Sequence, residues 1–418
     1  MEQKLFTKNF VLLVLGQVSS LFGNYILRLA LSMYVLETTG SAAVFAGILS
    51  AATIPTILLS PLGGILADRA NRRNIMVALD TLTGISVLCA AVALSENHAL
   101  MVIGALLVVL SVFGAFETPT VQACIPQMLA GDNIIRGNAV VNQVASISYL
   151  TAPMLGGILY AVFGLKPVMY ASVVCFFITA LFECFIQLGH QHRTYQGNVL
   201  SMVRNDFSDS IRFITKERAD IMKLLLLAAL SRFFVMGVTM VGIPFIVRTI
   251  LELDATYYGG AESALAVATI LGSIAAGLLT GKLKMERLSL VLAAIGICII
   301  PAGVVFLFQL GAVIKYVVSV VAFCGMQATI SIFSIFAVSM IQQSTPDYLL
   351  GKVMAYTSAI TMCAQPVGQM VYGFLFDGCR EAVYLVLIPT GVIVGMIGVG
   401  ARGFSGDWRR EDFADFQN

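Results

Sequence analysis

Long apolar runs recur along the whole 418-residue chain. A helix needs about 20 mostly apolar residues to cross the hydrocarbon core of a bilayer. We count twelve such runs, and several exceed 25 residues, which indicates tilt or extension beyond the bilayer. The runs are 10–36, 42–66, 74–95, 99–126, 134–162, 166–188, 220–248, 257–281, 286–309, 314–342, 350–376 and 380–401. The expected fold class is therefore an all-α membrane protein with twelve transmembrane helices.

The composition excludes a water-soluble enzyme of this size. Charged residues make up 11% of the chain and hydrophobic residues 58%, whereas soluble domains carry about 25% charged residues. The net charge of +2 gives no reason to expect a nucleic-acid partner. The eight cysteines lack the spacing of a metal site, so we expect no metal, no cofactor and no disulfide. The sequence has no phosphate-binding loop, which argues against ATP as the energy source.

The basic residues predict the orientation. If both termini are cytoplasmic, nineteen of the 25 lysines and arginines lie on the inner side and four on the outer side. The positive-inside rule predicts this asymmetry, and an odd number of spans would remove it. We therefore expect a multi-pass membrane protein with both termini in the cytoplasm.

The longest polar stretch divides the twelve runs into two groups of six. The halves share an order of features, because Gly137 precedes a helix with Pro153 and Gly351 precedes a helix with Pro366. Internal repeats of this kind are typical of secondary transporters. The sequence predicts an N-terminal six-helix half, a cytoplasmic linker, a C-terminal six-helix half and a cytoplasmic tail, at residues 1–188, 189–219, 220–402 and 403–418.

A motif between the second and third runs carries a family resemblance. The segment reads Gly63-Gly64-Ile65-Leu66-Ala67-Asp68-Arg69-Ala70-Asn71-Arg72-Arg73. It resembles the cytoplasmic loop signature of the major facilitator superfamily, which it matches at Gly64, Asp68, Arg69, Arg72 and Arg73. It departs at Asn71, where that family usually has glycine. The resemblance implies that Gly64 permits a close helix approach and that Asp68 holds the two halves together near the start of span eleven. The alternative is a basic loop that only fixes the topology.

A second motif in the fifth run points to the same family. Ala152-Pro153-Met154-Leu155-Gly156-Gly157 resembles the Gly-Pro-x-x-Gly-Gly signature of the antiporter branch, with Ala152 in place of the first glycine. Pro153 is expected to bend the helix, and Gly156 and Gly157 to let a neighbour pack against the bend. The alternative is an ordinary proline bend.

The resemblance extends over nearly the whole chain, which is similar to bacterial drug exporters of the macrolide-efflux and siderophore-exporter groups. It implies a major facilitator fold with two pseudo-symmetric six-helix halves. In that fold, spans one, four, seven and ten line a central cavity.

Three charged residues lie well inside runs that the resemblance places around this cavity: Arg28, Glu117 and Arg232. A charge at bilayer depth costs at least about 2.5–3.5 kcal/mol, so each needs a partner or a water-filled cavity. The helix rise places Glu117 and Arg232 at a similar depth, roughly 13–17 Å from the inner face. We hypothesise that Glu117 and Arg232 face each other and that Glu117 exchanges protons. The alternative is a permanent structural ion pair.

Polar residues at helical spacing mark one face of each of these spans. Aromatic and methionine side chains beside them suit bulky amphipathic molecules. The residues expected to line the cavity are Gln17, Asn24, Tyr25, Phe113, Phe116, Met236, Thr239, Gln327 and Ser331. The alternative is helix packing with occasional polar contacts.

Other ionisable residues in or near the spans have plainer expectations. Asp80 and Glu183 are expected to bond groups of the cytoplasmic loops, and Glu37 and Glu262 to be solvated near the outer face. His190 and His192 have no carboxylate or cysteine nearby in the sequence, so they do not predict a metal site.

These observations predict a monomeric antiporter and not an enzyme. It would export a hydrophobic or amphipathic drug or metabolite in exchange for protons, by alternating access. The alternative is a transporter of an organic anion gripped by Arg28 and Arg232. A membrane enzyme or sensor would need a soluble domain, for which residues 189–219 and 402–418 are too short.

Overall fold

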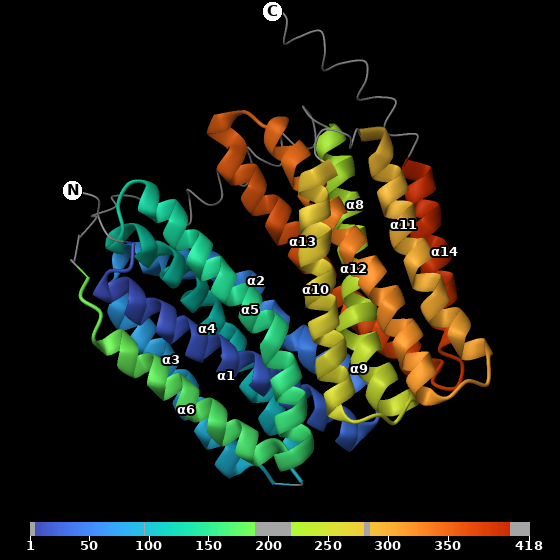
Figure 1. Ribbon diagram of the computed structural model, residues 1–418, viewed down its shortest axis with the longest axis horizontal. Helices are drawn as coiled ribbons and strands as arrows, with labels where there is room; N and C mark the ends of the chain where they lie inside the picture. Colours follow the sequence, from blue (N-terminus) through green and yellow to red (C-terminus); the bar gives the residue numbers. More distant parts are fainter. Residues whose placement is uncertain (1–4, 96, 189–218, 280–284, 402–418) are drawn as a thin grey trace, which may run out of the picture. The chain divides into compact units, whose positions relative to one another are not determined.

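The computed structural model describes residues 5–95, 97–188, 219–279 and 285–401. The predicted all-helical class is confirmed, because these residues form helices and no strand. The first six runs correspond to single long helices (Figure 1), namely α1 (Lys8–Thr39), α2 (Ala42–Arg69), α3 (Arg72–Ala93), α4 (Ala99–Met128), α5 (Asp132–Phe163) and α6 (Leu165–Cys184).

The remaining six runs are also helical. The seventh is a succession of four segments, α8 (Ala219–Gly237), η2 (Val238–Gly242), α9 (Ile243–Phe245) and η3 (Ile246–Ile250). The others are α10 (Ala255–Leu279), α11 (Met285–Val304) extended by η4 (Val305–Leu307), α12 (Ala312–Gln343), α13 (Asp347–Gly378) and α14 (Tyr384–Gly400). The predicted twelve helices are thus present among the described residues.

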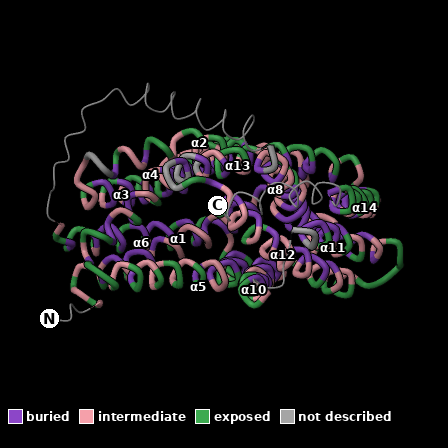
Figure 2. Tube along the Cα trace, turned by 90° about the horizontal axis from the view of Figure 1, so that it is seen from above, coloured by how far each residue is buried: buried purple, intermediate pink, exposed green. Residues whose placement is uncertain are grey.

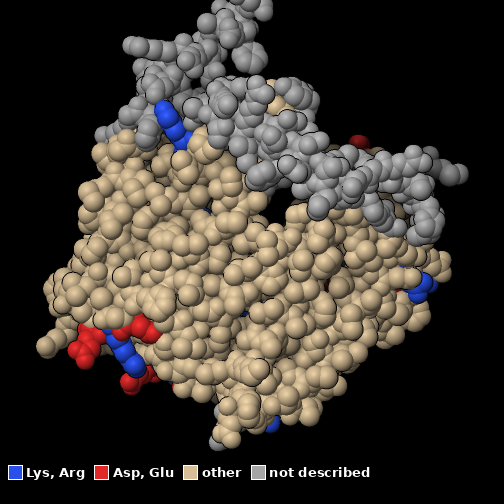
Figure 3. Space-filling model, turned by 180° about the vertical axis from the view of Figure 1, so that it is seen from behind, with Lys and Arg blue, Asp and Glu red and all other residues tan. Residues whose placement is uncertain are grey.

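The helix surfaces suit a hydrocarbon solvent. Ten helices are long and apolar enough to cross a membrane, and α14 is a shorter apolar helix. Large apolar side chains are widely exposed, among them Val92, Met101 and Leu278 at 73%, 77% and 79%. On the face in Figure 3 most of the surface comes from residues other than lysine, arginine, aspartate and glutamate. Such a surface is unfavourable in water and favourable against lipid.

The seventh span departs from regular α-helix in two π-helical segments, η2 and η3. Pro244 lies between them, in α9. Proline has no N–H and its ring clashes with the carbonyl four residues earlier in a regular helix. A wider π turn accommodates both effects, so Pro244 accounts for the change of helix type.

The chain divides into two compact units. Unit 1 comprises the described residues within 1–40, 47–195 and 253–263, and unit 2 the described residues within 41–46, 196–252 and 264–418. The first residues of α2 thus group with the C-terminal helices, and the first residues of α10 with the N-terminal ones. The predicted boundaries at residues 188 and 402 lie beside residues outside the described ranges, so they stay a prediction.

Within unit 1, α6 lies beside both α1 and α3 (Figure 1). Hydroxyl groups join α1 to α6: Ser19 Oγ donates to the Cys175 carbonyl at 2.9 Å, and Thr179 Oγ1 donates to the Gly16 carbonyl at 3.1 Å. Buried and exposed residues alternate along α1, α5 and α6 (Figure 2), as expected for helices with one face toward protein and one toward lipid.

A second contact in unit 1 involves the motif of the fifth run. A Cβ atom added to Gly157 would lie 2.6 Å from the Ala255 carbonyl oxygen, and one added to Gly259 would lie 2.4 Å from the Pro153 carbonyl oxygen. Gly156 faces the backbone of Ile26 at 3.1 Å. The two motif glycines therefore permit close packing of α5 against α1 and against the first turns of α10.

In unit 2, Asp377 near the end of α13 caps the start of α2. Its Oδ1 accepts from the Ala42 N–H at 2.6 Å, and its Oδ2 accepts from the Ala43 N–H at 2.9 Å and the Ser41 hydroxyl at 2.5 Å. A carboxylate is stabilising at a helix N-terminus, where N–H groups lack helical partners. No sequence pattern pointed to Asp377 in advance.

We predict that Gly157→Ala destabilises the protein by ~1–3 kcal/mol, because the added methyl group meets a backbone oxygen that cannot move aside. The melting temperature of the purified protein in detergent measures this effect. The matched control is Gly114→Ala in α4, where an added Cβ meets nothing within 4 Å. Equal melting temperatures for the two variants would contradict the close approach.

We predict that Asp377→Asn speeds hydrogen exchange at the Ala42 and Ala43 amides by about tenfold, because an amide offers one acceptor oxygen where the carboxylate offers two. Hydrogen–deuterium exchange with mass spectrometry over residues 41–46 provides the measurement. Glu381→Gln, an exposed acid close by in the sequence, is the control and should leave the exchange unchanged. Unchanged exchange in Asp377→Asn as well would show that the cap contributes nothing.

Candidate functional site

The polar face of α1 leads into the interior of unit 1. Gln17 and Ser20 are buried, at 7% and 2% exposure, and Asn24 and Arg28 are half-buried. Arg28 Nε donates to Asn24 Oδ1 at 2.6 Å, one turn away on the same helix. The predicted alignment of these side chains on one helical face therefore brings an amide, a hydroxyl and a guanidinium group into the protein interior.

Ser20 is the centre of a group of carboxyl side chains. Its hydroxyl lies 3.1 Å from Asp80 Oδ1 on α3 and 3.3 Å from Glu117 Oε1 on α4. Glu183 on α6 lies within hydrogen-bonding reach of Asp80. We call Asp80, Glu117 and Glu183 the carboxyl cluster.

The expectation that Asp80 and Glu183 bond loop groups is wrong. Both are only 1% exposed and lie against each other inside the helical bundle of unit 1. The reason is the packing of α6 on α3, which the sequence does not specify. Their depth in the predicted spans could have indicated that they lie at one level, because all three carboxyl groups are within about three turns of the same predicted membrane face.

Glu117 is half-buried, and its surroundings in unit 1 are now defined. Besides Ser20, it has the guanidinium of Arg28 close enough to attract its charge. Phe113 and Phe116 on the same helix are half-buried as well. The hypothesised pairing of Glu117 with Arg232 joins residues of different units and stays a prediction.

A tyrosine pair and a buried acid occupy another part of unit 1. The rings of Tyr25 and Tyr149 meet edge to face, 5.6 Å apart. Glu262 on α10 is 7% exposed, with Tyr258 within hydrogen-bonding reach. The expectation that Glu262 is solvated is therefore wrong, because the first turns of α10 pack on α5. Glu37 is exposed, as expected, and accepts a hydrogen bond from the Tyr160 hydroxyl at 2.7 Å.

In unit 2, Arg232 has an uncharged partner. Its Nη2 donates to Gln365 Oε1 on α13 at 3.3 Å, while its Nε is buried without a hydrogen bond. Met236, one turn further along α8, is half-buried. Thr239 is only 2% exposed and donates to the Val235 carbonyl, so its hydroxyl group is already satisfied.

Helix α12, the tenth span, contributes two of the predicted cavity residues, and both have hydrogen-bond partners. Gln327 Nε2 donates to Thr269 Oγ1 on α10 at 3.1 Å, and Ser331 Oγ donates to the Gln327 carbonyl at 3.0 Å. Both residues are half-buried. Gln327 thus links two helices of unit 2, which is the packing role that the sequence left open as an alternative.

The loop motif is only partly as predicted. A Cβ atom added to Gly64 would meet nothing within 4 Å, whereas one added to Gly63 would lie 2.3 Å from the Ala115 carbonyl oxygen. The close approach of α2 to α4 therefore occurs at Gly63, one residue and about 100° around the helix from the expected position. The side chains of Asp68 and Arg69 lie outside the described part of the structure, so their roles stay predictions.

The two following arginines hold helix ends together. Arg72 donates to the Ala67 and Ala123 carbonyl oxygens, each at 2.7 Å, and Arg73 donates to the Cys184 carbonyl. Asn71 accepts from the Arg73 N–H at 3.1 Å and caps α3. The asparagine at this position, where the family signature has glycine, thus serves as the N-cap of α3.

No group of three metal-binding side chains is arranged to hold an ion among the residues that the structure describes. His190 and His192 lie outside those residues. All eight cysteines are free thiols.

Comparisons with known proteins agree with this architecture. A family model of the Major Facilitator Superfamily matches residues 13–369. The chain is 24% identical over 393 residues to macrolide efflux protein A of Streptococcus pyogenes, which covers 90% of this chain and 92% of that protein. It is 22% identical over 403 residues to the multidrug efflux pump Tap of Mycolicibacterium fortuitum, covering 93% of this chain and 94% of the pump.

Solved structures share the fold at low sequence identity. A bacterial homologue of the iron transporter ferroportin, in an inward-facing state, superposes with a TM-score of 0.72 at 16% identity, over 95% of this chain and 98% of that one. A D-xylose-proton symporter gives 0.71 at 12% identity, over 93% and 96%. The family model spans most of the sequence and these folds agree with the twelve helices, so the chain belongs to the Major Facilitator Superfamily and is a multi-pass membrane transporter, not an enzyme.

Proposed function

We propose that this transporter exports hydrophobic or amphipathic drugs or metabolites from the bacterial cytoplasm in exchange for protons. It would work by alternating access, as a monomer in the inner membrane with both termini in the cytoplasm. The observation that carries the proposal is Glu117, an acid inside a span that touches the Ser20 hydroxyl and has Arg28 nearby. The efflux relatives support the direction and the substrate class.

The chemistry of Glu117 suits coupling. When Glu117 is ionised, its charge is attracted by Arg28, and when it takes up a proton that attraction is lost. Each protonation state therefore favours a different arrangement of α1 and α4. A ligand whose binding favours one of these arrangements is then coupled to the proton. The sequence-based hypothesis adds Arg232 as a second cation for the same carboxylate.

A second candidate substrate class has its own support. Among the residues that the structure describes, Arg28 and Arg232 donate to the neutral amides of Asn24 and Gln365 and not to carboxylates. Guanidinium groups are well suited to bind carboxylate or phosphate. A transporter of organic anions would use these two arginines directly.

We predict that Glu117→Gln lowers proton-gradient-driven uptake of erythromycin into inverted vesicles by at least about tenfold, whereas Glu117→Asp retains a large part of it. The difference follows because only aspartate can still gain and lose a proton. Glu37→Gln removes an exposed acid on the same helix as Ser20 and is the control. Equal activity of Glu117→Asp and Glu117→Gln would exclude Glu117 as the exchanging group.

We predict that Arg28→Gln changes exchange of labelled for unlabelled erythromycin or tetraphenylphosphonium, measured in vesicles without a proton gradient, by less than about threefold, because neither compound offers an acidic group to a guanidinium. Uptake of the organic anion fluorescein in the same vesicles tests the second candidate class. Fluorescein transport by the wild type that is lost in Arg28→Gln would favour the anion transporter over the drug exporter.

A further inference from the structure

The carboxyl cluster brings together four helices of unit 1. Asp80, Glu117 and Glu183 come from α3, α4 and α6, and Ser20 from α1 contacts two of them. Asp80 and Glu183 are the two most deeply buried carboxyl groups of the three, at 1% exposure each. The proposed function uses Glu117 alone and leaves these two acids without a role.

The two contacts of Ser20 are both full hydrogen bonds when one of the two carboxyl groups carries a proton. A hydroxyl group carries a single hydrogen, yet Ser20 Oγ lies within hydrogen-bond distance of both Asp80 and Glu117. If Ser20 donates to one carboxylate, the other must be protonated in order to donate to the serine oxygen. One proton in this part of the cluster satisfies both contacts.

Asp80 and Glu183 lie within hydrogen-bonding reach of each other. Two ionised carboxylates have no hydrogen to share, so a hydrogen bond between them needs one to be protonated. Three ionised carboxyl groups in a site shielded from water would also repel one another strongly.

Few other charges act on the cluster. Among the described residues, Arg28 on α1 is the cation that acts on it, through Glu117, and it can balance one negative charge. Arg73 donates to the Cys184 carbonyl beside Glu183 and not to its carboxyl group. α3, α4 and α6 contribute the three acids themselves. Charge balance thus favours one ionised carboxyl group and two protons.

Buried polar atoms without a hydrogen-bond partner indicate that a small polar molecule binds at the cluster. Within the described part of the chain, Asp80 Oδ2 and Glu183 Oε2 are buried acceptors without a hydrogen bond, and Gln17 Nε2 is a buried donor without one. Gln17 lies one turn before Ser20 on the polar face of α1 and is 7% exposed. It therefore shares a buried helical face with the serine that contacts the cluster.

These atoms suit a water molecule better than a metal ion. A water molecule can accept from the Gln17 amide and donate to the two carboxyl oxygens. An amide N–H has nothing to offer a cation, and no three acids among the described residues have metal-binding geometry.

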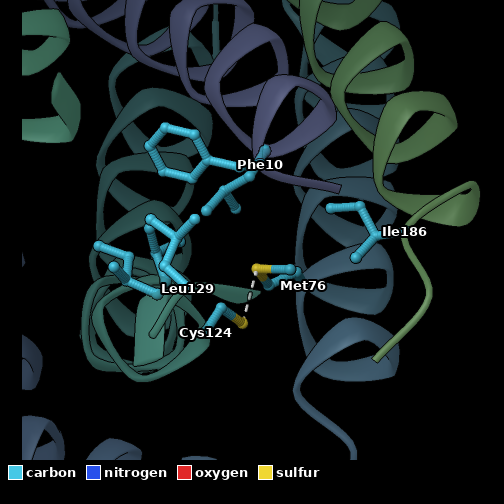
Figure 4. Close-up of a cluster of buried hydrophobic side chains, with 8 residues drawn as sticks. Phe10, Met76, Cys124, Leu129 and Ile186 are labelled. Atoms are coloured by element: carbon cyan, nitrogen blue, oxygen red, sulfur yellow. Dashed lines mark hydrogen bonds between the residues drawn. The ribbon is translucent and has the colours of Figure 1, made fainter. Parts of the chain in front are cut away.

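A group of buried apolar side chains, which we call the apolar plug, packs next to residues of the cluster along α3 and α4. The plug consists of Phe10, Leu13, Met76, Val121, Cys124, Ile125, Leu129 and Ile186, all buried and packed together (Figure 4). Met76 lies one turn before Asp80 on α3, and Cys124 about two turns after Glu117 on α4. Ile186 follows Glu183 by three residues.

Along α3 and α4, plug residues therefore lie between the cluster and the helix ends at Arg72 and Met128. The polar route leads the other way along α1, from Ser20 to Asn24 and Arg28. Protons would reach and leave the cluster along this route while the plug is closed.

We propose that Asp80, Glu117 and Glu183 form one shared proton-binding site, reached along the polar face of α1, and that its protons are those exchanged for substrate. The last part rests on the proposed function. In each cycle a carboxylate of the site takes up a proton and becomes a carboxylic acid, and it is ionised again when that proton leaves to the other side. The site takes no metal and no second substrate.

The first test needs no transport. Infrared spectroscopy of the purified full-length protein in lipid nanodiscs, titrated with acid and base, reports protonated carboxyl groups that are shielded from water. The wild type should show such bands at neutral pH, with intensity lost in Asp80→Asn and in Glu183→Gln and kept in Glu37→Gln. Bands unchanged in both cluster variants would overturn the proposal of a shared proton-binding site. Melting temperatures show whether each variant is folded.

The second test uses the same proteins in proteoliposomes with erythromycin as the probe. Asp80→Asn and Glu183→Gln should lower accumulation driven by a proton gradient by at least about tenfold, while exchange of labelled for unlabelled erythromycin without a gradient continues. Normal gradient-driven accumulation in both variants would overturn the inference and leave the proposed function intact. Wild-type accumulation of erythromycin that does not depend on the proton gradient would instead refute the proton coupling.

Discussion

The structure of unit 1 depends on the cost of removing ionisable groups from water. Each carboxyl group inside a span must find a hydrogen bond, a proton or an opposite charge, since lipid offers none. Ser20 meets this need for two acids at once. Its position on α1 therefore ties α3 and α4 to the helix that also carries Arg28. Glu183 adds α6, so the polar contacts and the apolar helix packing join the same four helices.

The two units also show how helix ends can be shared. The start of α2 groups with unit 2, where Asp377 caps it, and the start of α10 groups with unit 1, where Gly157 and Gly259 permit close packing. In both cases a few N-terminal residues of a helix associate with the helices of the other half of the chain. The first association depends on a carboxylate that accepts hydrogen bonds from N–H groups at a helix start, and the second depends on close backbone packing.

The twelve helices could be predicted from the sequence because hydrocarbon allows few alternatives to an apolar helix. Contacts between helices could not be predicted as well. Gly63 rather than Gly64 meets α4, because the rotation of a helix about its axis depends on all its neighbours. Asp80 and Glu183 were expected at loops, since the sequence does not state that α6 packs on α3. Glu262 is buried rather than solvated for a similar reason. In contrast, the polar face of α1 was predictable from spacing alone, because it belongs to a single helix.

The central claim is that movement of a drug in one direction is tied to movement of protons in the other. Drug flux and proton flux, recorded together in proteoliposomes that contain only this protein, test it most directly. A gradient of erythromycin imposed without a pH difference should drive a measurable proton flux in the opposite direction. Erythromycin movement with no accompanying proton flux would contradict the account.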